Sequence, residues 1–238
     1  MKGSRAGHIR NVIAATLVFS VTGCATTGTA DPADPWEGFN RGVYSFNQTM
    51  DNILFDPLGK GYQAITPDVV DRGISNMFSN LNDLSVIAND ILQFKFNQAL
   101  TDALRFVYNS TAGLLGFFDV STPIGMPKND EDFGQTLAVW GVGPGPYLVV
   151  PFFGPSTVRD AVGFGADALL NPVMYLDNEA VRAGLLSLNY IDFKADLLSA
   201  KTLLGEAALD EYDFVKSAYL EKRDAQVNDR TSSEFTEE

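Results

Sequence analysis

The sequence of 238 residues contains one histidine, His8, and one cysteine, Cys24. Both lie near the amino terminus, in a segment whose pattern is typical of export and processing. A mature chain that has lost residues 1–23 and is acylated on Cys24 has neither an imidazole nor a free thiol. These absences exclude Ser-His-Asp triads, Cys-His pairs, zinc sites built on His or Cys, and disulfide bonds.

The chain also lacks a hydrophobic run long enough to span a membrane. A basic start is followed by an uncharged stretch from Val12 to Val21 and by small residues before Cys24. This stretch is about ten residues long, whereas a membrane-spanning helix needs roughly 20. The layout is that of a secretory signal. We therefore expect residues 1–23 to be removed as a signal peptide.

Positive charge is scarce in this sequence. There are 17 Lys and Arg residues against 30 Asp and Glu residues, which gives a formal net charge of -13. Removal of residues 1–23 takes away three cations and no anion, so the charge of the mature chain is -16. Such a charge repels nucleic-acid phosphates and also argues against docking on anionic lipid. We expect no nucleic-acid partner, and any contact with a membrane must be hydrophobic.

Residues 21–24, Val-Thr-Gly-Cys, resemble the lipobox of bacterial lipoproteins. In these proteins the cysteine sulfur carries a diacylglycerol and the new amino terminus is acylated, and several acyl chains together anchor a protein firmly. The resemblance implies the outer membrane, because Ala25 and not Asp follows Cys24. Residues 24–33 are then a lipidated tether, and no cofactor is expected beyond these acyl chains. The alternative is a secreted protein with one free cysteine.

Two segments suggest binding chemistry but lack the required pattern. The acidic segment 129–132 has neither the spacing nor the distal Glu of an EF-hand, and we interpret it as a solvated loop. The segment 141–146, Gly-Val-Gly-Pro-Gly-Pro, is not followed by Lys-Ser/Thr, and its prolines lack N–H donors. We interpret it as a bent connection whose glycines permit positive φ. Only carboxylate chemistry remains available, and we expect that the protein is not an enzyme.

Helical periodicity dominates residues 34–222. Asp34, Pro35 and Glu37 fit the N-cap, N1 and N3 positions of a helix start. Apolar residues then recur at steps of three and four and form one stripe: Phe39, Val43, Phe46, Met50 and Ile53. Similar spacing predicts helices over 67–92, 97–112, 131–140, 156–170, 178–190, 192–206 and 209–222. We predict one mainly α-helical domain over 34–222, followed by a polar, acidic and disordered tail over 223–238.

Two points stay open from the residues alone. The segment 113–155 holds most of the Gly-Pro punctuation, and within it Tyr147–Val150 fits a strand, a helix or an extended wall. The composition is 45% hydrophobic with 17 Phe, and the mean hydropathy is near zero despite the high charge. These apolar side chains either fill an ordinary core or also cover an outer face that sits in a lipid leaflet.

Residues 34–41, Asp-Pro-Trp-Glu-Gly-Phe-Asn-Arg, and 44–47, Tyr-Ser-Phe-Asn, resemble the start of the mature domain in the MlaA/VacJ family of outer-membrane lipoproteins. Segments 116–120, 132–137 and 140–156 resemble the same family in order and spacing, and the likeness covers about residues 34–222. The resemblance implies a ring-like helical protein in the inner leaflet of the outer membrane. It also implies that mislocalised phospholipid of the outer leaflet enters an amphipathic channel and passes to a periplasmic shuttle, while a trimeric porin holds the ring.

The resemblance also implies which residues act in the channel. It assigns the segment around Gly141, Gly143 and Gly145 to a hairpin loop that adjusts channel opening, and Phe46 to a helix that keeps the channel gated. A β-branched residue in place of Gly143 is expected to impair transport. The candidate channel or gating residues are Phe39, Asn40, Phe46, Asn47, Gly141, Gly143, Gly145 and Tyr147. The alternative for those of the first helix is ordinary packing in a core.

Two other functions stay open. A structural lipoprotein that braces porins would need no cavity for lipid. A cell-wall hydrolase would need a groove of sugar size with paired carboxylates, although no Glu stands in a recognisable catalytic segment. Transport, in contrast, predicts a channel with apolar and polar walls and an apolar outer belt, because a lipid headgroup and its acyl chains require different surroundings.

Overall fold

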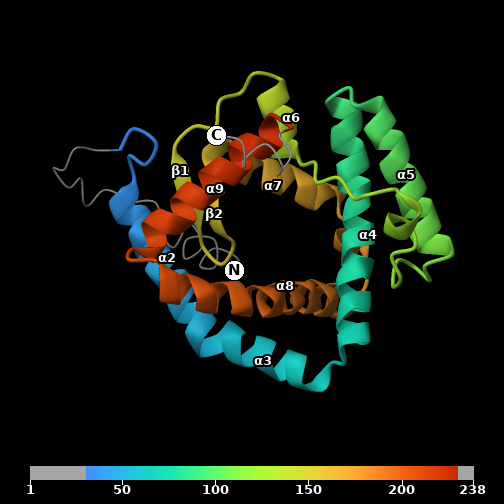
Figure 1. Ribbon diagram of the computed structural model, residues 1–238, viewed down its shortest axis with the longest axis horizontal. Helices are drawn as coiled ribbons and strands as arrows, with labels where there is room; N and C mark the ends of the chain where they lie inside the picture. Colours follow the sequence, from blue (N-terminus) through green and yellow to red (C-terminus); the bar gives the residue numbers. More distant parts are fainter. Residues whose placement is uncertain (1–30, 230–238) are drawn as a thin grey trace, which may run out of the picture.

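The computed structural model describes residues 31–229. The predicted signal peptide, Cys24 and residues 230–238 lie outside the described residues. The helices and one β-hairpin are arranged around a central opening, so the protein is a ring (Figure 1). The prediction of a mainly helical, ring-like domain is confirmed.

The elements follow one another around this ring with short connections. In chain order they are α2 (Glu37–Met50), a π-helical turn (Asp51–Phe55), α3 (Asp56–Ile65), α4 (Asp68–Leu92), α5 (Phe96–Thr111), a 3-10 turn (Thr122–Ile124), α6 (Phe133–Val139), β1 (Tyr147–Val150), β2 (Gly154–Thr157), α7 (Val158–Leu170), a 3-10 turn (Pro172–Tyr175), α8 (Glu179–Ala207) and α9 (Glu211–Val227).

Contacts between distant segments close the ring. Helix α3 lies beside α8, and α4 meets α8, α6 and α7, while α5 packs on the outer side of α4 (Figure 1). The antiparallel strands β1 and β2 pair Tyr147 with Thr157 and Val150 with Gly154. Strand β1 contacts α2, and β2 contacts α9. The segment Tyr147–Val150 is therefore a strand, which resolves the ambiguity of its sequence.

The helices expose many of their apolar side chains and bury polar ones. On α2, Asn40 is 0% exposed, whereas Phe39 beside it is 46% exposed. On α5, Asp102 is 0% exposed, whereas Leu100 is 62% exposed. Among the described residues, 23 polar or charged side chains are buried but only eight hydrophobic ones. Soluble proteins show the opposite preference, so these helices pack through polar seams and leave apolar side chains exposed.

Hydrogen bonds and ion pairs join the helices at these seams and satisfy many of the buried polar groups. Asp192 of α8 accepts hydrogen bonds from the Tyr62 hydroxyl of α3 and from the Ser75 hydroxyl of α4, both at 2.9 Å. Arg41 of α2 forms an ion pair of 2.9 Å with Asp210, which precedes α9. A buried polar group costs little only when it is paired, and each of these pairs joins elements that are far apart in the sequence.

The predicted start of the first helix is wrong. Helix α2 begins at Glu37, and no side chain caps it. Asp34 is buried instead, and its carboxylate accepts hydrogen bonds from the Asn40 amide at 2.8 Å and from the Tyr212 hydroxyl at 2.5 Å. Glu37 pairs with Arg41 at 2.7 Å and does not return to a cap. Tertiary partners therefore outcompeted the local capping motif.

Helix boundaries near the carboxyl end also differ from the prediction. Residues 178–190 and 192–206 belong to one continuous helix, α8. The Asp192 side chain binds α3 and α4 and does not cap the start of a new helix. Helix α9 continues to Val227, past the predicted boundary at residue 222, and Arg223 is buried. The other predicted helices are found with boundaries shifted by a few residues. Within residues 31–229, no helix combines the length and apolarity needed to cross a membrane.

Candidate functional site

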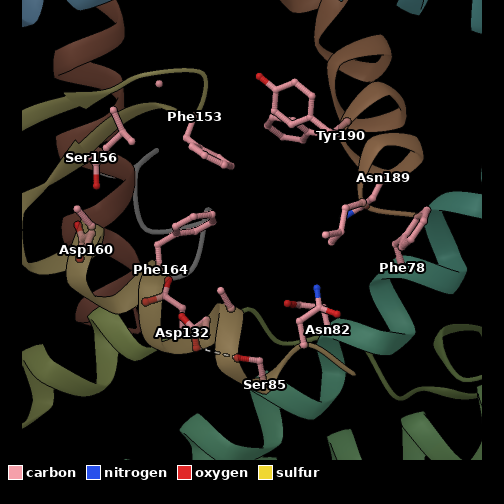
Figure 2. Close-up of a pocket in the computed structure, with 18 of the residues that line it drawn as sticks. Phe78, Asn82, Ser85, Asp132, Phe153, Ser156, Asp160, Phe164, Asn189 and Tyr190 are labelled. Atoms are coloured by element: carbon pink, nitrogen blue, oxygen red, sulfur yellow. Dashed lines mark hydrogen bonds between the residues drawn. The ribbon is translucent and has the colours of Figure 1, made fainter. Parts of the chain in front are cut away.

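A cavity of about 1090 Å³ occupies the middle of the ring. Its walls come from elements across the chain, and Figure 2 shows the side chains that point into it from several sides. The lining residues are Phe55, Leu58, Phe78, Leu81, Asn82, Ser85, Glu131, Asp132, Val150, Phe153, Gly154, Pro155, Ser156, Asp160, Ala161, Phe164, Asp167, Ala168, Leu170, Asn171, Met174, Leu186, Ser187, Asn189, Tyr190, Ile191, Phe193, Tyr219 and Arg223. The cavity is large enough for a drug-sized or lipid-like ligand.

Aromatic rings form one part of the wall. The ring of Phe153, at the tip of the hairpin, lies 4.7 Å from that of Phe164 on α7 and 6.2 Å from that of Tyr190 on α8, measured between centroids. The Tyr190 hydroxyl donates to the Phe152 carbonyl at 2.7 Å. Burial, with the nearby charge of Asp51, raises the pKa of Tyr190 to about 12. This wall is therefore apolar and uncharged at neutral pH.

A guanidinium cluster, Asp132, Asp160 and Arg223, forms a second part of the wall. The two terminal nitrogens of Arg223 donate to Asp132 at 2.5 and 2.6 Å, and one of them also donates to Asp160 at 2.9 Å. Asp160 receives further hydrogen bonds from Arg159 at 3.1 Å and from the Tyr219 hydroxyl at 2.8 Å. The cluster joins α9 to the start of α6 and to α7.

The charge of Arg223 decides the ionisation of its partners. Burial opposes ionisation of Asp132 and Asp160, but the hydrogen bonds and charge of Arg223 hold the pKa of both carboxyls below the usual range. Burial also disfavours the guanidinium, yet the two carboxylates raise the pKa of Arg223 further. All three groups are therefore charged at neutral pH, and both carboxylates form ion pairs with Arg223.

The Ser85–Asp167 corner, made of Asn82, Ser85 and Asp167, forms a third part of the wall (Figure 2). The Ser85 hydroxyl donates to Asp167 at 2.7 Å, and the amide of Asn89 donates to the same oxygen at 2.8 Å. The backbone N–H of Phe133 donates to the other oxygen at 2.9 Å. These bonds link α4, α6 and α7 and hold the Asp167 carboxylate in one orientation at the cavity.

The acidic segment 129–132 is not the solvated loop that we expected. Glu131 is buried and pairs with Lys95 at 2.8 Å, while Asp132 caps α6 by accepting from the Gln135 N–H. Asn129 donates to the buried Asp102 at 2.8 Å. Among residues 31–229, no group of three or more Asp, Glu, His or Cys side chains is arranged to hold a metal ion. The segment is thus a structural part of the cavity wall.

Asn40 and Asn47, two helical turns apart on α2, bind the outer edge of strand β1. Asn40 donates to the Tyr147 carbonyl at 3.0 Å and accepts from the Val149 N–H at 2.9 Å. Asn47 donates to the Val150 carbonyl at 3.0 Å and accepts from the Phe152 N–H at 2.7 Å. Both amides therefore position the hairpin, and neither lines the cavity.

The other candidates lie around the same hairpin. Phe46 is exposed, and its ring lies 5.4 Å from that of Phe152 in an edge-on contact. Phe39 is exposed, and Tyr147 is buried against Tyr212 and Tyr219. The structure brings Asn40, Phe46, Asn47 and Tyr147 together at the hairpin but places none of the candidates among the lining residues. Their role in gating stays a prediction.

The glycine segment precedes the hairpin and is not its turn, which lies at residues 151–153. Gly141 has φ +90° and Gly145 has φ +66°, a backbone conformation that favours glycine. An added Cβ at Gly145 would also lie 3.3 Å from the Val158 Cβ. Gly143 has no positive φ, and a Cβ there would meet open space. The backbone argument for glycine thus applies to Gly141 and Gly145 and not to Gly143.

Sequence reasoning missed the polar residues of the cavity. Ser85 and Asp167 are 82 positions apart, and Asp132 and Arg223 are 91 positions apart, so no local motif joins them. Asp132 lies in a segment that resembles the family, but Arg223 was assigned to the tail. No spacing in the sequence could have paired them.

Comparison with known proteins places this chain among envelope lipoproteins. The profile of the family described as MlaA lipoprotein matches residues 32–226. The intermembrane phospholipid transport system lipoprotein MlaA of Escherichia coli K12 is 34% identical over 214 residues, which cover 87% of this chain and 84% of that protein. An uncharacterized protein of Rickettsia bellii is 33% identical over 201 residues, with coverage of 84% and 79%.

A solved structure resembles this chain along most of its length. That structure is described as the structural basis for maintenance of bacterial outer membrane lipid asymmetry. It superposes with a TM-score of 0.71 at 31% identity, and the match covers 82% of this chain and 98% of that one. The likeness therefore extends to the whole ring and not only to single motifs.

Proposed function

This chain belongs to the MlaA lipoprotein family, and from that premise we propose that it removes mislocalised phospholipid from the outer leaflet of the outer membrane. In this proposal the lipid enters the central cavity of the ring and passes to a periplasmic carrier. The process maintains the lipid asymmetry of the membrane. It breaks no covalent bond, so the protein acts without enzymatic chemistry.

The observation that carries the proposal is the mixed lining of the cavity. A phospholipid has a charged headgroup and apolar chains. Moving it requires polar surroundings for the headgroup and shielding of the acyl chains from water. The ring supplies an aromatic wall of Phe153, Phe164 and Tyr190, and it supplies polar groups such as Asn82 and Asp167 in the same cavity. An ordinary structural brace has no need of such a passage.

The exposed apolar side chains support a place within a lipid leaflet. Contiguous exposed apolar surface marks sites of contact with a membrane or another protein, and these residues recur on α2, α4 and α5. We propose that the ring sits in the inner leaflet of the outer membrane, on the periplasmic face, and that acyl chains on Cys24 anchor it there. A trimeric porin that holds the ring and a soluble shuttle that receives the lipid are the proposed partners.

Deletion of the gene, followed by assay of phospholipid in the outer leaflet, tests the proposal. We expect outer-leaflet phospholipid to rise in the deletion strain and to return to normal when the wild-type gene is restored. Unchanged asymmetry together with displaced porins would favour the scaffold function instead.

Filling the cavity separates transport from scaffolding within the folded protein. Ser187→Trp places a large ring among the lining residues of α8, whereas Ser199→Trp places the same ring on an exposed part of α8 outside the lining. We expect the first variant to fail in restoring asymmetry and the second to succeed. Equal rescue by both variants would argue against passage through the cavity.

A further inference from the structure

The charges on the cavity wall are unevenly balanced. Four carboxylates and one guanidinium line the cavity: Glu131, Asp132, Asp160, Asp167 and Arg223. Glu131 pairs with Lys95 at 2.8 Å and Asp160 pairs with Arg159 at 3.1 Å, and both of these cations lie behind the wall. Arg223 is held by Asp132 and Asp160. Asp167 alone has no Lys or Arg within ion-pair distance among residues 31–229.

The Asp167 carboxylate is nevertheless fixed in place by neutral donors. Its first oxygen accepts from Ser85 at 2.7 Å and from Asn89 at 2.8 Å, and its second oxygen accepts from the Phe133 N–H at 2.9 Å. A carboxylate offers about four acceptor positions, so one position on the second oxygen is left. Asp167 therefore presents an oriented negative charge with spare hydrogen-bonding capacity at the cavity.

Two side-chain amides of the cavity lining have no protein partner among residues 31–229. Asn82 lies one helical turn before Ser85 on α4, and Asn189 projects from α8 on another side of the cavity (Figure 2). Within the described part of the chain, neither amide makes a hydrogen bond. An unpaired amide in a cavity can donate to a phosphate oxygen without carrying charge.

We propose that the Ser85–Asp167 corner binds the headgroup of a zwitterionic phospholipid that carries a primary ammonium group, such as phosphatidylethanolamine. The ammonium group donates to the free position of Asp167, and the phosphate accepts from the amides of Asn82 and Asn189. This assignment rests on the proposed function, because it names the lipid class that the cavity selects.

Electrostatics favours this class over anionic lipids. Every glycerophospholipid brings a phosphate, but the only cation on the wall, Arg223, already serves two carboxylates. An anionic headgroup such as phosphatidylglycerol would add an uncompensated charge beside Asp167, where water is partly excluded and repulsion is strong. An ethanolamine headgroup neutralises Asp167 and carries its own positive charge. We expect a preference of about tenfold for phosphatidylethanolamine.

The test uses the full-length lipidated protein in detergent, equilibrated with an equimolar mixture of acyl-matched phosphatidylethanolamine, phosphatidylglycerol and phosphatidylcholine. The lipid that copurifies is quantified by mass spectrometry. Wild-type protein is expected to enrich phosphatidylethanolamine over phosphatidylglycerol about tenfold. Asp167→Asn is expected to bind a similar amount of lipid with a preference below about twofold. Asp177→Asn, which removes an exposed carboxylate outside the cavity lining, should keep the wild-type preference.

The outcomes separate this inference from the proposed function. Bound lipid without preference in the wild type, or full preference in Asp167→Asn, would overturn the headgroup assignment and leave transport intact. A wild-type protein that carries no phospholipid would contradict the proposed function itself. The comparison with phosphatidylcholine uses only the wild-type protein, so it does not depend on whether Asp167→Asn folds. Equal enrichment of phosphatidylcholine and phosphatidylethanolamine would overturn the role of the primary ammonium group.

Discussion

The guanidinium cluster and the Ser85–Asp167 corner face the same cavity, but their carboxylates differ in what neutralises them. Asp132 pairs with Arg223, and Asp160 pairs with both Arg223 and Arg159, so two guanidinium groups balance the two carboxylates. Asp167 has three neutral donors and keeps its full charge. The first group joins helices, and its carboxylates need no further cation. The second is rigid and incomplete, which is the condition expected of a binding site.

The largest effect should follow from breaking the guanidinium cluster. Arg223→Met keeps most of the side-chain volume but leaves the half-buried Asp132 and the buried Asp160 without their shared cation. Removing one partner of a buried ion pair typically costs about 3–5 kcal/mol. We expect a loss of this order in the free energy of unfolding, measured by chemical denaturation in detergent. The neighbouring Lys222 is exposed, and Lys222→Met should change stability by less than about 0.5 kcal/mol.

A second, smaller effect should follow from breaking the hydrogen bonds of Asn40, which involve no cation. Asn40→Ala removes the partners of the Tyr147 carbonyl and the Val149 N–H, and it also removes a donor to Asp34. Buried groups left without a partner cost about 1–3 kcal/mol. The same denaturation experiment should detect this loss, whereas Asn97→Ala on the exposed face of α5 should be nearly neutral. An equal effect of both variants would contradict the stabilising role of the hydrogen bonds between Asn40 and strand β1.

A third type of buried carboxyl, which has neither a paired cation nor a hydrogen-bond donor among the described residues, should make the stability of the protein depend on pH. Asp90 is 0% exposed, and no N–H or hydroxyl of the described residues donates to it. Burial, together with the nearby negative charges of Asp102 and Glu131, raises the pKa of Asp90 to about 8. The folded protein therefore binds a proton that the unfolded chain releases above about pH 4. Stability is full below that pH and falls as pH rises toward 8.

The expected slope is at most about 1.4 kcal/mol per pH unit. Denaturation midpoints measured between pH 5 and pH 8 should fall in the wild type and stay flatter in Asp90→Asn. The exposed carboxyl of Asp130 offers a matched control, since Asp130→Asn should follow the wild-type curve. Stability that rises over this pH range in the wild type would be inconsistent with a protonated Asp90. Asp132 and Asp160 act in the opposite direction, because their lowered pKa stabilises the fold above about pH 4.

The smallest effect on stability should belong to the corner itself. Asp167→Asn keeps an acceptor oxygen for Ser85 or Phe133 and removes a charge that no cation balances. We expect a change of less than about 1 kcal/mol in the same denaturation assay. A loss as large as that of Arg223→Met would place Asp167 among the structural carboxylates and erase the distinction between the two groups.

The sequence predicts the helices well because their periodicity is strong. The helices expected over 67–92 and 97–112 are found as Asp68–Leu92 and Phe96–Thr111. Periodicity does not tell whether an apolar stripe faces a core or a lipid leaflet, since Phe39 and Phe46 recur at the same spacing in both cases. The structure excludes a buried core for this stripe, because Asn40 and Asn47 are buried whereas Phe39 and Phe46 are exposed.

The site was harder to predict than the fold. Its polar groups meet only after the ring closes, as for Ser85 with Asp167 and Asp132 with Arg223. A capping motif at Asp34 and an apparent break before Asp192 were misleading for the same reason. In each case a distant partner, and not the neighbouring sequence, determined where the side chain went.

The exposed apolar side chains of α2 and α5 reverse the usual pattern of mutational tolerance. At Phe39 or Leu100, exchange for another large hydrophobic residue should change little, because both side chains are exposed. At Asn40 or Asp102, no apolar residue can replace the lost hydrogen bonds. A substitution map of this protein would therefore show polar residues at its most constrained positions and exposed hydrophobic residues at its most permissive ones.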